Sequence, residues 1–433
     1  MTPESSAQLK DSLKNIINLY SAGQLQEALN LIEILHTKYP NQSIIYNING
    51  ACYSGLNKFD SAIKCYKKAI EVSPNYSDAY NNLGNALLRI GNLDEAAMFL
   101  KKAIIIKPDY IDAIFNLGST LKELGQLEES NRLFKKVISL KPNHFKAHLL
   151  LGLNLKIAKQ YSLAIIYLEK VLELRPKFAP GYLNIGNIYS DLGQKKQAIQ
   201  YFEKALIIKP EYKQAQYKLN ALTGKNSKSS PKEYVENLFN GYAENFDESL
   251  VNSLGYNLPF QIKDWITKLD SKRKKFNKVI DLGCGTGLSG KSLREISKNL
   301  TGIDLSKNMV EKARELEIYD DLLVGDIEEV LSNASEKYDL FVALDVFVYL
   351  GDLEAIFKTI KLCSNKNAYL IFSVEIQEGD GFSLLETLRF SHSEKYILNT
   401  AINDFNLIKT YDLKLRKHKK SWIKGKTFIL QVS

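Results

Sequence analysis

The residues best suited to chemistry lie in one glycine-rich stretch, residues 279–287. An apolar run ends there at a turn containing Gly283, Gly285 and Gly287, and a second apolar run ends at Asp304. Glycine permits positive φ and lets a ligand approach the backbone closely. The order predicts a strand, a turn, a helix and a second strand, with a ligand beyond the carboxyl ends of the strands. Asp304 is then placed to accept two ribose hydroxyls, so the stretch predicts a nucleoside-cofactor site.

The glycine spacing narrows the choice of cofactor. A dinucleotide site needs G-x-G-x-x-G, with a pyrophosphate at the helix N-terminus, but Leu288 stands where the third glycine belongs. Asp281 would repel a pyrophosphate and suits a cationic ligand that carries an amine and a sulfonium. The stretch therefore resembles motif I of class I S-adenosylmethionine-dependent methyltransferases. The alternative is an ordinary βαβ turn. The resemblance implies these cofactor-binding residues: Asp281, Gly283, Cys284, Gly285, Gly287 and Asp304.

Two further segments extend the resemblance. Residues 234–247 are similar to a segment that folds over the cofactor in many small-molecule methyltransferases, which implies that Tyr242 and Phe246 cover its methionine end. The alternative is a hydrophobic staple on the sheet. At the end of a third strand, the resemblance implies that Asp326 accepts from the adenine amino group. Ile327 would pack on the adenine, with Ile303 or Leu305 on its other side; a surface turn is the alternative for Asp326.

Several further residues could orient the methyl acceptor or remove a proton from it. Asp345 follows a fourth strand, where it could orient the acceptor or act as a base. His392 and Glu375 are further candidate proton acceptors, because histidine is a competent base near neutral pH; a hydrogen-bonded loop histidine is the alternative. The basic segment 414–420 is predicted to be a hairpin turn that attracts an acidic substrate or is merely solvated. An Asn/Asp-Pro-Pro-Tyr segment is absent, which argues against DNA bases and glutamine amides as acceptors.

Alternating strand and helix patterns must position these residues, and they predict a parallel sheet. Strands are expected near 278–282, 300–304, 321–325, 338–344, 367–374, 406–415 and 424–431. Helices are expected near 287–297, 306–317, 351–363 and 393–404, with others at 250–269 before the first strand. Seven strands ending in a hairpin match the class I methyltransferase sheet, whose last strand is antiparallel.

The first half of the chain is a repeat with a period of 34 residues. Prolines keep this spacing at 40, 74, 108, 142, 176 and 210, and glycines keep it at 50, 84, 118, 152 and 186. A period of 34 is that of tetratricopeptide repeats, each a pair of antiparallel helices. We expect six repeats, at 9–42, 43–76, 77–110, 111–144, 145–178 and 179–212, with a capping helix at 213–223.

Asparagines recur on the first helix of several repeats and predict a partner site. An amide offers a donor and an acceptor, so it can pair with a peptide backbone regardless of sequence. The pattern is similar to the asparagine ladder of the O-GlcNAc transferase superhelix, although Ile48 and Leu150 interrupt it; exposed polar positions are the alternative. The asparagines in question are Asn82, Asn116 and Asn184 in one phase, and Asn85 and Asn187 in another.

Charge and composition limit the remaining functions. Residues 1–223 hold 28 Lys and Arg against 19 Asp and Glu, so the net charge of +9 belongs to this half and favours an acidic partner or a solvated surface. Basic and aromatic residues do not interleave as in nucleic-acid binding, so no nucleic acid is expected. No apolar leader or spanning run is found, and four unpaired cysteines fit a reducing cytoplasm. No His/Cys cluster has metal-ligand spacing.

Together these patterns predict a solenoid of tetratricopeptide repeats at 1–223, a linker at 224–231 and a Rossmann-like class I methyltransferase domain at 232–433. The layout resembles bacterial tetratricopeptide-repeat-containing methyltransferases. It implies a cytoplasmic enzyme that uses S-adenosylmethionine and whose repeats recruit a protein. The alternatives are a non-catalytic adaptor that keeps only a ligand-binding domain, and an enzyme that modifies nucleic acids.

Overall fold

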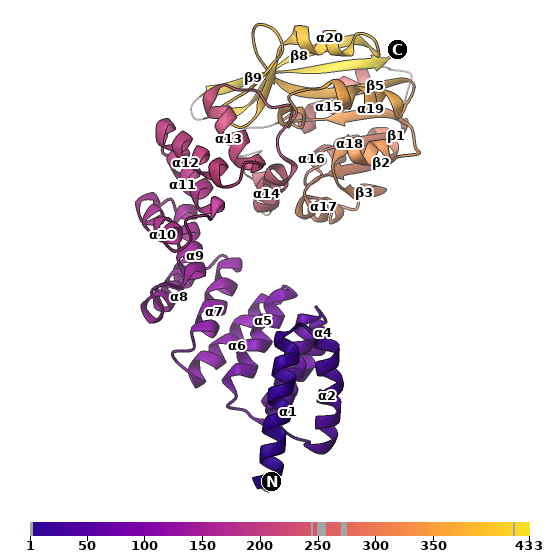
Figure 1. Cartoon of the computed structure of the whole chain (residues 1–433). Coiled ribbons are helices and arrows are strands. Elements are labelled where there is room, and N and C mark those ends of the chain that lie inside the picture. Colours follow the sequence, from indigo (N-terminus) through magenta and orange to yellow (C-terminus); the bar gives the residue numbers. More distant parts are fainter. Residues whose placement is uncertain (1–2, 244–245, 249–256, 270–274, 419–420) are drawn as a thin grey trace. The chain divides into compact units, whose positions relative to one another are not determined.

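A computed structural model describes residues 3–243, 246–248, 257–269, 275–418 and 421–433. The chain forms two compact units, Met1–Tyr201 and Phe202–Ser433. The first unit consists of paired helices, and the second contains the sheet (Figure 1).

The 34-residue pattern produces two helices per repeat. They are α1 (Pro3–Ser21), α2 (Leu25–Lys38), α3 (Ser43–Gly55), α4 (Phe59–Val72), α5 (Ser77–Arg89), α6 (Leu93–Ile106), α7 (Ile111–Glu123), α8 (Leu127–Leu140), α9 (Phe145–Ile157), α10 (Tyr161–Leu174), α11 (Ala179–Asp191) and α12 (Lys195–Ile208). The last of these helices crosses the division between the two units.

The recurring glycines let the two helices of a repeat touch. A Cβ on Gly84 would lie 2.5 Å from Leu100 Cγ, and one on Gly118 would lie 2.8 Å from a ring carbon of Phe134. Ser130 stands where other repeats have alanine, and its buried hydroxyl donates to the carbonyl of Gly118 at 2.7 Å. The small residues are therefore required by close packing between helices.

The second unit contains a mixed sheet flanked by helices. Its strands are β1 (Phe276–Leu282), β2 (Ser297–Asp304), β3 (Asp321–Val324), β4 (Tyr338–Ala343), β5 (Ser364–Ile376), β6 (Phe382–Leu384), β7 (Phe390–His392), β8 (Phe405–His418) and β9 (Ser421–Val432). Its helices after α12 are α13 (Lys213–Thr223), α14 (Lys232–Tyr242), α15 (Leu258–Leu269), α16 (Leu288–Ile296), α17 (Lys307–Arg314), α18 (Ile327–Ser332), the 3-10 helix η3 (Phe347–Tyr349), α19 (Glu354–Leu362) and α20 (Glu394–Ala401).

The strand order places the carboxyl ends of the central strands together. The order is β3-β2-β1-β4-β5-β7-β6, with β9 also pairing with β5 and β8. The first five strands run parallel, whereas β9 is antiparallel to β5, as the sequence predicted for the last strand.

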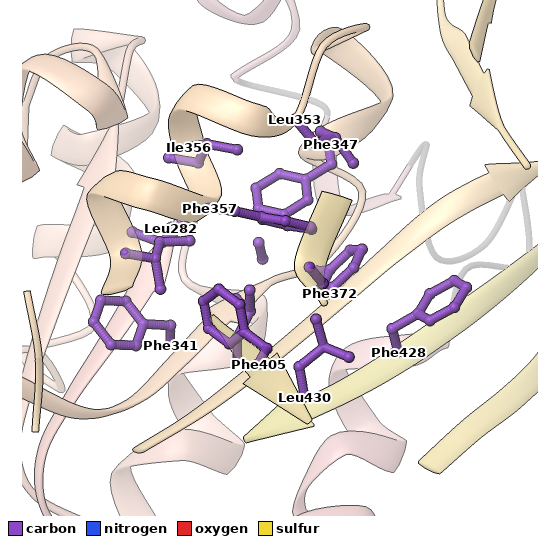
Figure 2. Packing of buried hydrophobic residues seen from close by; sticks show 14 of the residues in the cluster. Leu282, Phe341, Phe347, Leu353, Ile356, Phe357, Phe372, Phe405, Phe428 and Leu430 are labelled. Carbon is purple, nitrogen blue, oxygen red and sulfur yellow. The ribbon is translucent and has the colours of Figure 1, made fainter. Parts of the chain in front are cut away.

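Two apolar clusters hold the helices to this sheet. In one of them, Phe357, Phe372 and Phe428 pack with ring centroids 5.4–5.6 Å apart (Figure 2). In the other, Trp265 of α15 stacks on Tyr411 of β8 at 4.7 Å. Each fully buried aromatic side chain contributes about 1.5–3 kcal/mol by its removal from water.

Several predicted boundaries were wrong. Residues 414–418 belong to β8 and not to a turn, while Lys419 and Lys420 lie outside the described residues. The short strands β6 and β7 and the helix α18 were not predicted. Of the segment predicted to be helical at 250–269, residues 257–269 are described and contain α15.

The predicted linker makes specific hydrogen bonds within the second unit. The Asn226 side chain donates to the carbonyl of Phe382 at 2.7 Å and accepts from the Leu384 amide at 2.8 Å. The Lys228 carbonyl accepts from the Gly351 amide at 2.8 Å. Residues 226–228 are thus held against the β6 and η3 region, which composition alone did not reveal.

Candidate functional site

The glycine turn after β1 and the end of β2 build one corner of a pocket. Gly283, Gly285 and Gly287 all have positive φ, at 68°, 53° and 91°. The carboxylate of Asp304 accepts from the Gly285 amide at 2.9 Å through one oxygen and from the Ser306 amide at 2.8 Å through the other. Burial raises the pKa of Asp304, and these backbone donors oppose that effect. The backbone amides of Gly285 and Ser306 therefore fix the position of the Asp304 carboxylate.

The pocket lies at the carboxyl ends of β1, β2, β3 and β4, where an open α/β sheet binds ligands. Most of the residues predicted to bind the cofactor line it, together with Asp345. The lining residues from the predicted set are Phe246, Gly283, Cys284, Gly285, Asp304, Leu305, Asp326, Ile327 and Asp345. Tyr242, Asp281, Gly287 and His392 are not part of the lining.

Asp281 lies next to the pocket but is enclosed by protein. It is 1% exposed, and it accepts a hydrogen bond from the Tyr319 hydroxyl at 2.8 Å. Burial raises its pKa to about 7. The direct ligand contact predicted for Asp281 is therefore not present. Gly287 instead begins α16, where a Cβ would lie 2.8 Å from Leu316.

The predicted adenine end contains an acidic residue in a defined position. Asp326 begins α18, and its side chain accepts from the Glu329 amide at 3.2 Å. Lys232 of α14 lies 3.4 Å from Asp326 and 2.5 Å from Glu329. Lys232 and Glu328 also line the pocket, and neither was predicted, because only the fold brings α14 and α18 together.

The helix α14 covers one side of the pocket through Val235 and Phe239. The Asn240 side chain accepts from the Ser306 hydroxyl at 2.6 Å, and Phe239 packs edge-on against Tyr349 at 5.5 Å. Asp247 accepts from the Thr286 hydroxyl in the glycine turn. Tyr242, at the end of α14, is 51% exposed, so its predicted covering role is not seen; residues 249–256 lie outside the described part of the chain.

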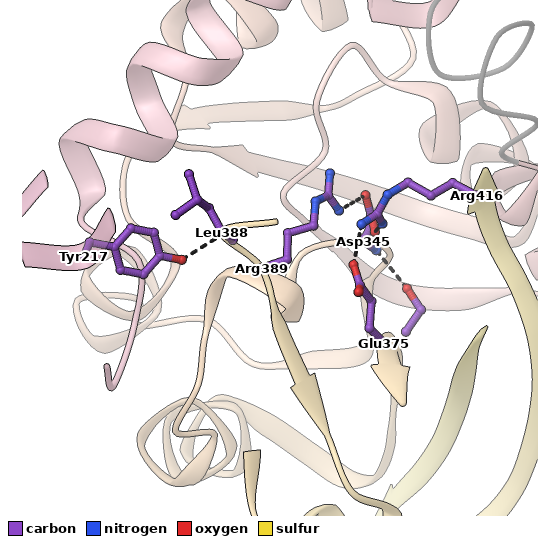
Figure 3. A network of polar contacts seen from close by, with 7 residues as sticks. Tyr217, Asp345, Glu375, Leu388, Arg389 and Arg416 are labelled. Atoms are coloured by element: carbon purple, nitrogen blue, oxygen red, sulfur yellow. Dashed lines mark hydrogen bonds and ion pairs between the residues drawn. The ribbon is translucent and has the colours of Figure 1, made fainter. Parts of the chain in front are cut away.

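Asp345 has two arginine partners at the wall of the pocket. Arg389 contacts one of its oxygens at 2.8 Å and Arg416 contacts the other at 2.9 Å (Figure 3). Arg416 also pairs with the buried Glu375. Both carboxylate oxygens of Asp345 are therefore engaged by guanidinium groups. The geometry therefore favours an orienting role for Asp345 over the predicted role as a base. Glu375, the other predicted proton acceptor, is likewise engaged in an ion pair with Arg416.

His392 is a packing residue in this structure. Its imidazole is fully buried, lies 3.0 Å from the Gly351 carbonyl through Nε2, and stacks on Tyr396 at 6.0 Å. Burial lowers its pKa to about 4. The predicted base role was wrong, since His392 lies outside the lining and the short strand β7 turns it inward.

The repeat asparagines bond mainly to the chain itself. Asn82 donates to Asn47 at 3.0 Å, and Asn116 donates to Asn81 at 3.0 Å, so each links its repeat to the preceding one. Asn184 donates to the Pro180 carbonyl in its own helix at 2.9 Å. In the other phase, Asn85 is exposed, and the Oδ1 of Asn187 is buried with no hydrogen-bond partner among the described residues. In the interrupted ladder predicted from the sequence, Asn82 and Asn116 therefore serve contacts between repeats, and Asn184 bonds within its own helix.

The described residues contain neither a metal cluster nor a helix that could span a membrane. Among the described residues, no three His, Cys, Asp or Glu side chains gather as they would around a metal ion. Within the same ranges, the helices are too short or too polar to cross a bilayer.

The chain matches several protein-family models. The methyltransferase domain model matches residues 255–400. Tetratricopeptide-repeat models match residues 53–91, 77–110, 111–144, 145–178 and 179–212, the last four with the boundaries predicted from the prolines.

The curated relatives are methyltransferases with different acceptors. The chain is 31% identical to an 18S rRNA (guanine-N(7))-methyltransferase of Arabidopsis thaliana, covering 22% of this chain and 37% of that protein. It is 40% identical to a malonyl-[acyl-carrier protein] O-methyltransferase of Yersinia pestis, covering 12% and 20%. It is 24% identical to a ubiquinone biosynthesis O-methyltransferase of Proteus mirabilis, covering 22% and 41%. The chain thus spans less than half the length of each of these relatives.

Among solved structures, the chain is similar to YrrB, described as a tetratricopeptide-repeat protein with an unusual peptide-binding site. That match has 22% identity and a TM-score of 0.39, and it covers 43% of this chain and 96% of YrrB. A match to MamA has 28% identity and a TM-score of 0.36, and it covers 37% of this chain and 95% of MamA. The family models, by contrast, identify tetratricopeptide repeats over residues 53–212 followed by a methyltransferase domain over residues 255–400.

Proposed function

We propose that this protein is a methyltransferase that uses S-adenosylmethionine as its methyl donor. The observation that carries the proposal is Asp304, whose two oxygens are held by backbone amides at the edge of a pocket formed by the ends of β1 to β4. A carboxylate in that position accepts the paired hydroxyls of a ribose.

The charges of the lining fit a cationic donor. Among the described lining residues, four carboxylates accompany one amine, that of Lys232. Arg389 and Arg416 compensate the charge of Asp345, so the remaining excess comes from three carboxylates against the one amine. This excess of negative charge attracts a ligand that carries a sulfonium and an ammonium group. The four carboxylates belong to Asp304, Asp326, Glu328 and Asp345.

The shape of the glycine turn also fits the donor. Among the described residues, an ideal Cβ on Gly285 would have one neighbour within 4 Å, a ring carbon of Phe246 at 3.7 Å. Gly285 and Phe246 both line the pocket. The space beside this backbone therefore remains open for a ligand. Asp304 would hold the ribose, Asp326 and Ile327 the adenine, and the turn from Gly283 to Gly285 the methionine end.

Once bound, the donor supplies an electrophilic methyl group on its sulfonium. The protein contributes by aligning the acceptor with that group and excluding water, an entropic advantage worth several kcal/mol, about 7 or more in well-oriented systems. The helix α14 excludes water on one side through Val235 and Phe239. Asp345, held by its two arginines, orients the acceptor and leaves proton removal to the acceptor's own ionisation.

The acceptor differs among the relatives, whose names give a guanine nitrogen in RNA, an acyl carrier protein and a ubiquinone precursor. We therefore propose only the class of the methyl acceptor. The repeats favour a protein. The excess of positive charge in the repeat half would attract an acidic protein or peptide. Of the predicted groove asparagines, Asn85 is exposed, and we propose it as one of the contacts with this partner.

The competing function is an adaptor that binds a ligand without turnover. Transfer of a labelled methyl group from S-adenosylmethionine to an extract of cells lacking this protein distinguishes the two. We expect incorporation with the natural chain and none with Asp304→Ala. Donor binding without incorporation into any fraction of the extract would support the adaptor instead.

A further inference from the structure

Two residues beside the pocket have backbone conformations that their side chains disfavour. Asp345 has φ 57° and Leu388 has φ 60°, in the left-handed region that glycine adopts freely. A bulky residue there is strained, and such strain persists only where surrounding contacts determine the conformation. The two residues lie in different segments, one after β4 and one just before β7.

Specific hydrogen bonds hold each strained residue. The Asp345 amide donates to the Ser373 hydroxyl of β5 at 2.8 Å. The Leu388 carbonyl accepts from the Tyr217 hydroxyl of α13 at 3.0 Å, and the Leu388 amide donates to the Leu385 carbonyl at 2.9 Å. A separate set of hydrogen bonds therefore fixes each of the two strained backbones.

Arg389 connects the two strained residues, Leu388 and Asp345. It follows Leu388 in the chain, its guanidinium lies 5.1 Å from the centre of the Tyr349 ring, and it pairs with Asp345 at 2.8 Å. Tyr349 and Asp345 both line the pocket, whereas Arg389 stands behind them. Figure 3 shows the sequence of contacts from Tyr217 through Leu388 and Arg389 to Asp345.

Tyr217, at one end of this series of contacts, is buried and held by further contacts. Tyr217 is 2% exposed, and its hydroxyl also lies 2.7 Å from that of Ser230, whose amide donates to the Tyr349 carbonyl at 2.9 Å. Its ring packs against Tyr234 at 5.6 Å and Phe390 at 6.2 Å. The helix α13 thus belongs physically to the methyltransferase site, although the sequence predicted it as a cap for the repeats.

We propose that Tyr217 and Arg389 are positioning residues for methyl transfer, which set Asp345 in the conformation that orients the acceptor. This inference rests on the proposed function for the identity of the reaction. It places part of the catalytic support on the helix that directly follows the last repeat, so a methyltransferase fragment that begins after residue 223 lacks it.

Amide hydrogen exchange of the full chain tests the coupling without any acceptor. Tyr217→Phe removes one hydroxyl and keeps the ring. We expect faster exchange both at residues 385–390 and at 343–347, by about fivefold or more, because local opening becomes easier. Arg389→Gln should speed exchange at 343–347 as well, and Arg389→Lys should restore part of the protection, because lysine keeps the charge but loses the planar fork.

Tyr182→Phe is the matched control. Its hydroxyl also donates to a backbone carbonyl, that of Pro176 at 3.1 Å, but it lies in the first unit. We expect no change at 343–347 in this variant. Faster exchange at 385–390 alone in Tyr217→Phe, with 343–347 unchanged in both Tyr217→Phe and Arg389→Gln, would overturn the inference.

Calorimetric titration with S-adenosylmethionine and labelled-methyl transfer to cell extract separate this inference from the proposed function. We expect both variants to bind the donor within about twofold of the natural chain and to transfer methyl groups about tenfold more slowly, since orientation is lost. Transfer at the natural rate would refute the positioning role. Absence of donor binding by the natural chain would refute the proposed function, while the exchange data would still decide whether the coupling exists.

Discussion

The glycines of the turn after β1 should respond differently to the same substitution. An alanine Cβ at Gly283 would lie 2.5 Å from Val346 Cγ2, whereas at Gly285 the nearest atom is a ring carbon of Phe246 at 3.7 Å. Both positions have positive φ, which costs an alanine about 1–2 kcal/mol. At Gly283 the crowding adds about 1–3 kcal/mol. We therefore expect the free energy of unfolding to fall by about 2–5 kcal/mol in Gly283→Ala and by about 1–2 kcal/mol in Gly285→Ala.

Gly285→Ala, which should lose less stability than Gly283→Ala, should nevertheless bind the donor less tightly than the natural chain. The Gly285 Cβ would enter the open space beside Phe246, so Gly285→Ala should weaken S-adenosylmethionine binding by about tenfold or more, equivalent to about 1.4 kcal/mol, with little loss of fold. Urea denaturation followed by tryptophan fluorescence measures the stability of the second unit alone, because both tryptophans, Trp265 and Trp422, belong to it. Calorimetry measures the binding. A Gly285→Ala protein that binds the donor as tightly as the natural chain would refute the assignment of this turn to the donor.

Three further outcomes are expected. Burial lowers the pKa of His392 to about 4, below its unfolded value near 6.5, so the stability that this histidine contributes is lost as pH falls between these values. Burial raises the pKa of Asp281 to about 7, which acts in the opposite direction over the same range, so the histidine is isolated by comparison with His392→Gln. In urea denaturation, the change in unfolding free energy from pH 7 to pH 5 should be more unfavourable in the natural chain than in His392→Gln by about 2 kcal/mol. Gly84→Ala should lower the stability of the repeats by about 1–3 kcal/mol in a circular-dichroism melt and leave donor affinity unchanged, because its Cβ would meet Leu100 and the Ala96 carbonyl. Lys232→Met should change the unfolding free energy by less than about 1 kcal/mol, because its ion pairs are half exposed; a larger fall in a urea titration would contradict this.

The architecture was predictable because it depends on local spacing. Prolines 34 residues apart define the repeats, and the alternation of strands and helices after residue 276 defines the sheet. The same holds for Asp304, Asp326 and Asp345, each of which follows a strand whose carboxyl end faces the pocket. The position of a residue at the end of a strand can be predicted from the sequence pattern.

What the sequence did not reveal depends on partners far apart in the chain. Asp281 is enclosed because Tyr319, 38 residues later, covers it. Asp345 is bound by Arg389, which directly precedes β7, and by Arg416 of β8, and sheet pairing brings both near it. His392 was read as a loop base because the three-residue strand β7 carries too few residues to show alternation.

Calorimetric titration of the full chain with S-adenosylmethionine, beside Asp304→Ala, tests the central claim most directly. The substitution removes the carboxylate that the Gly285 and Ser306 amides hold in place. We predict binding by the natural chain with a dissociation constant on the order of micromolar, about −8 kcal/mol, and loss of binding in the variant. No binding by the natural chain, or equal binding by both proteins, would contradict the account.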